Sequence, residues 1–163
     1  MRILGIDPGS RVTGFGVIDS DGRASRRVAS GCVRTQGTDF AARLGEIFAA
    51  LQAVITEHAP QQVAVEQVFV ARNAGTALKL GQARGAAIVA AVNQGLPVFE
   101  YTPRAVKQAL VGRGGADKEQ VQHMVRVLLG LHEGMGLDES DALAIALCHA
   151  HSHSTLDRLG GAR

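Results

Sequence analysis

The 163-residue sequence predicts an α/β fold, a mixed five-stranded sheet with helices on both faces. Two observations indicate this class. Three strand-like segments open the chain, and helical segments then alternate with two further strands. The length fits one domain, which we place at residues 1–150, followed by a flexible tail at 151–163. In such sheets the first strand usually lies centrally, with its carboxyl end at a binding crevice.

The first three strands are indicated by apolar runs and by one tight turn. They are expected at residues 2–7, 12–18 and 24–34. Gly14 and Gly16 lie in the second strand where side chains would otherwise stand. The turn Ser20-Asp21-Gly22 favours a hairpin between the second and third strands. We therefore expect the chain to open with an antiparallel meander.

The remaining elements follow from helical periodicity and from breaker residues. From Phe40 to Ile55 the apolar residues recur at the spacing of one helix face, and Pro60 ends that segment. A Val-rich run at 62–70 predicts a buried strand. The other expected elements are a strand at 98–101 and helices at 38–58, 73–93, from Pro103, at 117–129 and at 138–150.

Four acids stand out because of where they fall in these elements. Asp7 ends a buried strand and Glu66 interrupts another, so each carboxylate needs a cation or a proton. Asp138 and Asp141 are three residues apart and share one side of a helix. Two alternatives stay open here. Glu66 can form a buried salt bridge with an arginine, and Asp138 can be a helix N-cap with Asp141 in a capping box.

If these acids converge, they repel one another and need divalent cations. Oxygen ligands favour hard ions, so we expect Mg²⁺, with Mn²⁺ as a substitute. Two such ions shared by four carboxylates are the arrangement used for in-line phosphoryl displacement. One ion activates a water, and the other stabilises the leaving oxygen.

Charge is distributed unevenly along the chain. Residues 72–126 hold eight basic and three acidic side chains, a net charge of +5. Residues 127–163 hold two basic and five acidic side chains, a net charge of −3. A basic stretch beside an acidic cluster suits a polyanion held near a metal site. A solvated surface of uneven charge explains the same numbers equally well.

Several features limit the setting in which the protein works. Cys32 and Cys148 lie in apolar segments, which favours reduced core thiols and a cytoplasmic location. No apolar run approaches the ~18 residues of a membrane span, and the chain enters a strand at once, so we expect no membrane segment and no signal peptide. His149, His151 and His153 alternate near the end. A zinc site is conceivable there, but a solvated tail is the simpler interpretation.

A set of short motifs spread over residues 1–150 carries a resemblance to a known family. The motifs are Ile3-Leu4-Gly5-Ile6-Asp7-Pro8-Gly9-Ser10, Thr13-Gly14, Glu66-Gln67-Val68-Phe69, Leu80-Gly81-Gln82-Ala83-Arg84-Gly85, Val106-Lys107-Gln108, Asp117-Lys118 with Gln120-Val121, and Asp138 with Asp141-Ala142-Leu143-Ala144. Together they resemble the RuvC family, the bacterial Holliday junction resolvases, which have a ribonuclease H-like fold. Each motif alone is weak, but the combination is specific.

The resemblance implies a homodimer that binds a four-way DNA junction and nicks two opposite strands with Mg²⁺, in recombination and repair. It implies that Asp7, Glu66, Asp138 and Asp141 are the metal-binding catalytic acids. A branch-migration complex of RuvA and RuvB is the implied partner.

Three further positions match functional residues of the family. Lys107 and Lys118 match its basic residues near the scissile phosphate, and Phe69 matches its aromatic residue that stacks on a junction base. Without the family, solvated lysines and a core phenylalanine would be the simpler interpretations. Additional phosphate contacts are expected from Arg72, Lys79, Arg84, Arg104 and Arg113.

Other functions stay open at this point. A ribonuclease H-like nuclease with another nucleic-acid substrate would share the acids without needing Phe69 or the two lysines. An actin-like phosphate-binding ATPase would use Asp7-Pro8-Gly9 as a phosphate hairpin, but such folds carry two domains of this kind. A non-catalytic DNA-binding module gives no reason for a buried Glu66.

The long helix expected at 73–93 has a face of small residues. Ala77, Gly81 and Gly85 follow one another at four-residue spacing, which permits the close approach of a partner helix. We expect a dimer contact through this helix. Packing against the chain's own sheet is the alternative.

Overall fold

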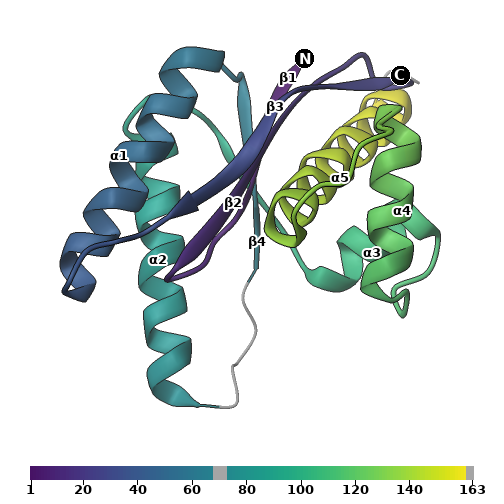
Figure 1. Ribbon diagram of the computed structural model, residues 1–163. Helices are drawn as coiled ribbons and strands as arrows, with labels where there is room; N and C mark the ends of the chain where they lie inside the picture. The colour runs from purple at the N-terminus through teal and green to yellow at the C-terminus, as the bar shows by residue number, and fades with distance from the viewer. Residues whose placement is uncertain (68–72, 161–163) are drawn as a thin grey trace.

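The computed structural model is described for residues 1–67 and 73–160, with side chains up to His153 in the last helix. Within these residues, five strands form one sheet in the order β3-β2-β1-β4-β5 (Figure 1). The strands are β1 (Arg2–Asp7), β2 (Val12–Ser20), β3 (Ser25–Arg34), β4 (Gln62–Glu66) and β5 (Val98–Tyr101). The pairs β1–β2 and β2–β3 are antiparallel, whereas β1–β4 and β4–β5 are parallel. The predicted mixed sheet with a central first strand is confirmed.

Helices cover both faces of this sheet, as the sequence predicts (Figure 1). The helices are α1 (Phe40–His58), α2 (Ala74–Val92), α3 (Pro103–Val111), α4 (Lys118–Leu129) and α5 (Leu137–Gly160). Alternate strand residues enter two separate cores, because successive side chains point to opposite faces. Ile3 belongs to the core beneath α3, α4 and α5, and its neighbour Leu4 belongs to the core beneath α1 and α2.

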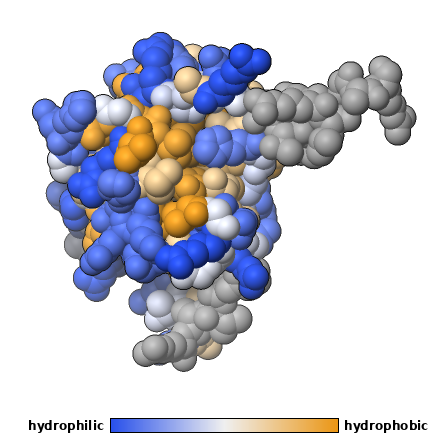
Figure 2. Space-filling model, turned by 90° about the vertical axis from the view of Figure 1, so that its right-hand side faces the viewer, coloured by the Kyte–Doolittle hydropathy of each residue, from blue (hydrophilic) through white to orange (hydrophobic). Residues whose placement is uncertain are grey.

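The outer side of the α3–α5 layer is not uniformly polar. Figure 2 shows an apolar patch within a mostly hydrophilic surface on this side of the molecule. Leu128 and Leu131 pack against the core of this layer while remaining partly accessible, and Val127 beside them is exposed. The core on this side is therefore only partly closed to solvent.

α5 packs very closely against β1 and β2 because glycines face it. A Cβ atom at Gly5 would collide with the carbonyl oxygen of Ala142, and one at Gly14 would collide with the carbonyl oxygen of Asp138. Any larger residue at these positions would push the helix away from the sheet. The glycines thus bring the start of α5 to the end of β1, where Asp7 lies.

Two element boundaries differ from the expectation. β4 ends at Glu66, and residues 68–70 of the expected strand lie outside the described residues, whereas α5 continues well past residue 150, to Gly160. Residues beyond 150 still contact the fold, because the His153 ring lies edge-on to the Phe99 ring of β5, with 6.4 Å between centroids. Cys32 also differs, since it is half-buried in β3 and not in the core. Within the described residues, no helix has the length and apolar character needed to span a membrane.

His149 belongs to a buried polar network, so its assignment to a solvated tail was wrong. Its side chain is 1% exposed. The Tyr101 hydroxyl lies 2.7 Å from Nδ1, and the Gln62 Oε1 lies 2.6 Å from Nε2. The imidazole also lies against the Phe99 ring, with 4.5 Å between centroids. Burial lowers the pKa of His149 to about 4, so the ring is neutral at physiological pH and joins α5 to β4 and β5.

Candidate active site

Three of the predicted acids meet where strands β1 and β4 end. The parallel register of these strands places Asp7 beside Glu66 at the carboxyl edge of the sheet. On its other side Asp7 pairs with Gly14 of β2, and Asp138 of α5 packs directly over that glycine. Strand register and a glycine contact therefore gather acids from three elements that are far apart in sequence.

The fourth acid lies in a pocket that also contains two lysines. Asp141 and Glu66 line this cavity of about 240 Å³ together with Lys107 of α3 and Lys118, the first residue of α4. Lys118 Nζ lies 3.3 Å from Asp141 Oδ2. The remaining walls of the pocket are formed by Pro103, Val106, Val121 and Ala144. The pocket thus places both predicted lysines beside two of the acids.

The electrostatics of this cluster are unfavourable without a cation. Burial, followed by repulsion from Glu66, Asp141 and Asp138, raises the pKa of Asp7 to about 7. Burial and Asp141 raise the pKa of Glu66, and Lys118 and Lys107 oppose that rise only in part. The two lysines do not neutralise the cluster.

The donor set fits hard divalent cations. All four side chains offer carboxylate oxygens, which Mg²⁺ and Mn²⁺ prefer. Among the described residues, however, no group of three or more His, Cys, Asp and Glu side chains is gathered as a ready metal site. The acids therefore form an open cluster, in which they interact electrostatically without forming a closed set of ligands.

The start of α5 is held in place by a residue that the sequence did not single out. Glu139 lies between the two acids of this helix and accepts a 2.6 Å hydrogen bond from Ser30 Oγ on β3. It also accepts from the Gly136 backbone at 3.3 Å and lies 3.8 Å from Arg27. No local pattern reveals this role, because Ser30 and Arg27 belong to a strand more than a hundred residues earlier. Because α5 starts at Leu137, Asp138 lies in the first turn of the helix and is not its N-cap.

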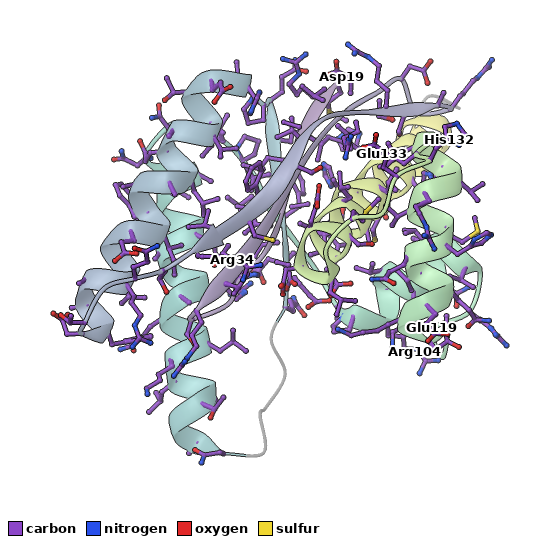
Figure 3. The ribbon with its side chains drawn as sticks, in the orientation of Figure 1. Asp19, Arg34, Arg104, Glu119, His132 and Glu133 are labelled. Atoms are coloured by element: carbon purple, nitrogen blue, oxygen red, sulfur yellow. The ribbon has the colours of Figure 1, made fainter. Side chains whose placement is uncertain are left out.

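The other predicted contact residues lie in different surroundings. Phe69 and Arg72 fall outside the described residues. Lys79 is exposed on α2, with its Nζ 5.9 Å from the centroid of the Phe40 ring. Arg104 and Arg113 are exposed around the loop between α3 and α4, and Figure 3 shows Arg104 at the lower end of that layer. Both are accessible to a nucleic-acid backbone.

Two arginines differ from the sequence-based interpretation. Arg84 points inward, and its Nε donates to the carbonyl oxygen of Glu66 at 3.1 Å. Arg34 was not singled out, yet it is exposed at the end of β3 and pairs in register with Val12 (Figure 3). The hairpin register between β2 and β3 was the signal that could have placed Arg34 at the same edge of the sheet as Asp7.

The strand order and the carboxylates at the end of the central strand define a ribonuclease H-like fold with a nuclease-type site. The chain belongs to the RuvC family: the profile described as "Crossover junction endodeoxyribonuclease RuvC" matches residues 3–149. It is 57% identical over 159 residues to the RuvC of Vibrio vulnificus (strain CMCP6), covering 98% of this chain and 92% of that one. It is 58% identical over 161 residues to the RuvC of Proteus mirabilis, covering 99% and 93%.

Solved structures agree with this family. T. thermophilus RuvC in complex with Holliday junction substrate superposes with a TM-score of 0.90 at 42% identity, covering 95% of this chain and 96% of that one. The yeast mitochondrial Holliday junction resolvase Ydc2 matches with a TM-score of 0.67 at 10% identity, covering 98% and 84%, which shows a shared fold alone. The predicted fold and the predicted family are both confirmed.

Proposed function

We propose that this chain resolves four-way (Holliday) DNA junctions by paired symmetric nicks, in recombination and DNA repair. The observation that carries the proposal is the open cluster of four acids beside the pocket of Lys107 and Lys118. Support comes from the family and from the T. thermophilus relative, which was solved with a Holliday junction substrate. A nuclease acting on another nucleic-acid structure would share the cluster and is the alternative.

Asp7, Glu66, Asp138 and Asp141 are proposed to hold two Mg²⁺ ions, with Mn²⁺ as a substitute. Bound ions in such a site supply an activated water and stabilise the leaving oxygen of a phosphodiester. The raised pKa of Asp7 is the reason to expect binding, because burial and then repulsion from the neighbouring carboxylates disfavour its charge, and a bound cation offsets both. The four carboxylates would hold and orient the cations at this edge of the sheet.

The basic and aromatic residues are proposed to hold the DNA. Lys107 and Lys118 face the pocket as point charges and stabilise negative charge that develops on the scissile phosphate. Phe69 is proposed to stack on a junction base, a contact worth ~1–3 kcal/mol. The proposed backbone contacts are Arg34, Arg72, Lys79, Arg104 and Arg113.

Two symmetric nicks need two active sites, so we propose that the protein is a homodimer formed through α2. Space beyond Gly81 and Gly85 is open, so this face does not pack on the chain's own sheet. Leu78, Val89 and Val92 on the same helix are exposed, which leaves apolar surface for a second copy. A monomer mass in gel filtration at micromolar concentration would count against this interface. The proposed setting is the cytoplasm, with RuvA and RuvB as partners.

One nicking assay separates the proposal from its alternatives. The protein is incubated with a synthetic four-way junction, a matched duplex and ATP, with Mg²⁺ or with EDTA. We expect symmetric nicks in the junction only, which are lost in EDTA and in Asp7→Asn. Equal cutting of the duplex would favour the alternative nuclease, and ATP turnover without nicks would refute both.

A further inference from the structure

The sheet lacks one backbone donor at the point where β4 meets the end of β1. Met1 and Ser20 exchange backbone hydrogen bonds of 2.6 and 2.9 Å, so every second residue from Met1 onward bonds to β2. The alternate residues of β1, which do not bond to β2, bond to β4 instead. Pro8 is the next residue in this second series. Proline has no N–H group. In this register the missing donor is the one that would reach the carbonyl oxygen of Glu66.

Arg84 supplies a donor to that oxygen from outside the sheet. Its Nε lies 3.1 Å from the Glu66 carbonyl oxygen. Its Nη2 lies 2.8 Å from Glu100 Oε1 on β5 and is inaccessible to solvent. This second contact is an ion pair, because the N–H groups of Nη2 make no well-aligned hydrogen bond. One guanidinium therefore connects α2, the end of β4, and β5.

The residue after Glu66 is held by the same group of side chains. Gln67 Nε2 donates to Glu100 Oε2 at 3.3 Å, and the Gln67 backbone N–H donates to the Tyr101 carbonyl at 2.8 Å. We call Arg84, Glu100 and Gln67 the β4-exit bracket. The bracket fixes the backbone on both sides of the Glu66 carbonyl, so the direction of the Glu66 side chain depends on it.

The position of Arg84 makes it a poor phosphate contact. Its side chain is only 20% exposed, whereas that of Glu100 is 43% exposed. The contact with Arg84 lowers the pKa of Glu100, so this carboxylate is ionised at neutral pH. A DNA phosphate would have to compete with this carboxylate for a largely covered guanidinium.

We propose that Arg84 is a positioning residue of the nuclease site. It substitutes for the donor that Pro8 lacks and thereby sets where the Glu66 carboxylate lies relative to Asp7 and Asp141. This inference rests on the proposed function, because the position of Glu66 matters only if its carboxylate takes part in the reaction.

The test compares Arg84→Met with Arg23→Met, which removes the same charge from an exposed turn at the opposite end of the sheet. With Arg84→Met we expect junction affinity in EDTA to stay within about twofold of wild type. Single-turnover cleavage at saturating enzyme should fall by roughly 10–100-fold, as for residues that orient metal ligands, and the half-saturating Mg²⁺ concentration should rise. Arg23→Met should match wild type in each measurement.

A second readout does not depend on activity. Hydrogen exchange of the Gln67 amide should be faster in Arg84→Met, since the backbone around it loses a tether. Arg84→Lys covers the case in which the methionine variant does not fold. It keeps the charge beside Glu100 but has no Nε donor, so it should show the same direction of change.

The outcomes distinguish the two proposals. The inference would be overturned if Arg84→Met bound the junction more weakly, with a salt dependence reduced by about one phosphate contact, and cleaved normally at saturation. Arg84 would then be a DNA contact. Unchanged exchange and cleavage would overturn it as well. If wild type does not nick junctions, the proposed function fails, and the exchange measurement still decides whether Arg84 holds the end of β4.

Discussion

Two polar clusters lie against the same helix, one near each end of its buried part. At the start of α5, Asp138 and Asp141 lie close to Asp7, and each negative charge raises the free-energy cost of ionising its neighbours. Further along, His149 has a partner at each ring nitrogen. Burial is the largest cause of the pKa shift in both, raising that of Asp7 to about 7 and lowering that of His149 to about 4.

The difference lies in whether the surroundings compensate for burial. Tyr101 and Gln62 satisfy the neutral imidazole, so this cluster contributes to stability. The acids have only Lys118 in direct contact within the described residues, and that lysine pairs with Asp141. A native fold retains such an uncompensated cluster when function requires it. The two ends of one helix thus separate a structural polar group from a functional one.

The largest expected effect comes from removing one carboxylate of the acidic cluster. Asp7→Asn should reduce single-turnover junction cleavage by on the order of 10³-fold or more, because it removes a carboxylate from the metal site. The same change should raise the melting temperature in EDTA, since it removes a charge that its neighbours repel. Cleavage assays and thermal unfolding of one preparation measure both effects.

Glu57→Gln is the matched control for this change, because it removes an exposed carboxylate from α1. It should leave cleavage and stability close to wild type. A destabilised Asp7→Asn protein would show that the acids are compensated in the metal-free fold, and the contrast with His149 would be lost.

The second largest effect is expected at His149, whose ring nitrogens both have hydrogen-bond partners. His149→Leu leaves the Tyr101 hydroxyl and the Gln62 amide without their partner, so unfolding free energy should fall by about 2–4 kcal/mol. Cleavage per folded molecule should not change. Tyr101→Phe removes one hydroxyl and should cost about 1 kcal/mol. Denaturant titration measures both variants, and a cleavage defect with normal stability would contradict the division of roles.

The acidic site was largely predictable because its geometry follows from regular structure. Strand ends at Asp7 and Glu66 and a three-residue spacing in a helix suffice to bring the carboxylates to one edge. Gly14, noted in the sequence as a missing side chain, proved to be the point where α5 meets β2. Helical periodicity and the ends of apolar strands are local signals, and they were sufficient to predict both the fold and the acids.

Arg84 and His149 were not predictable from such signals. Arg84 looks like one more cation in a basic stretch, and its partner is a backbone oxygen whose need for a donor depends on strand register and on Pro8. His149 lies in a locally polar segment, and its burial is decided by residues of β4 and β5. In both cases the deciding partner is remote in sequence.

The smallest expected effect is a pair of opposing pH slopes in the metal-free protein. The folded-state pKa of Asp7 lies above its ordinary value of 3.8, so between about pH 4 and 7 the native state keeps a proton that the unfolded chain releases. Stability from this group is therefore lost as the pH rises toward 7. The folded-state pKa of His149 lies below its ordinary 6.5, so stability from that group is lost as the pH falls from 6.5 toward 4.

In wild type the two slopes oppose each other, and each single variant should expose the one that remains. In EDTA, the unfolding free energy of Asp7→Asn should rise with pH between 4 and 6.5, and that of His149→Gln should fall over the same range. A single group contributes at most about 1.4 kcal/mol per pH unit, so denaturant titrations at three pH values resolve the signs. Equal slopes in both variants would mean that other groups control the pH response. Opposite slopes would show that burial acts on both clusters and that hydrogen bonding compensates for it only at His149.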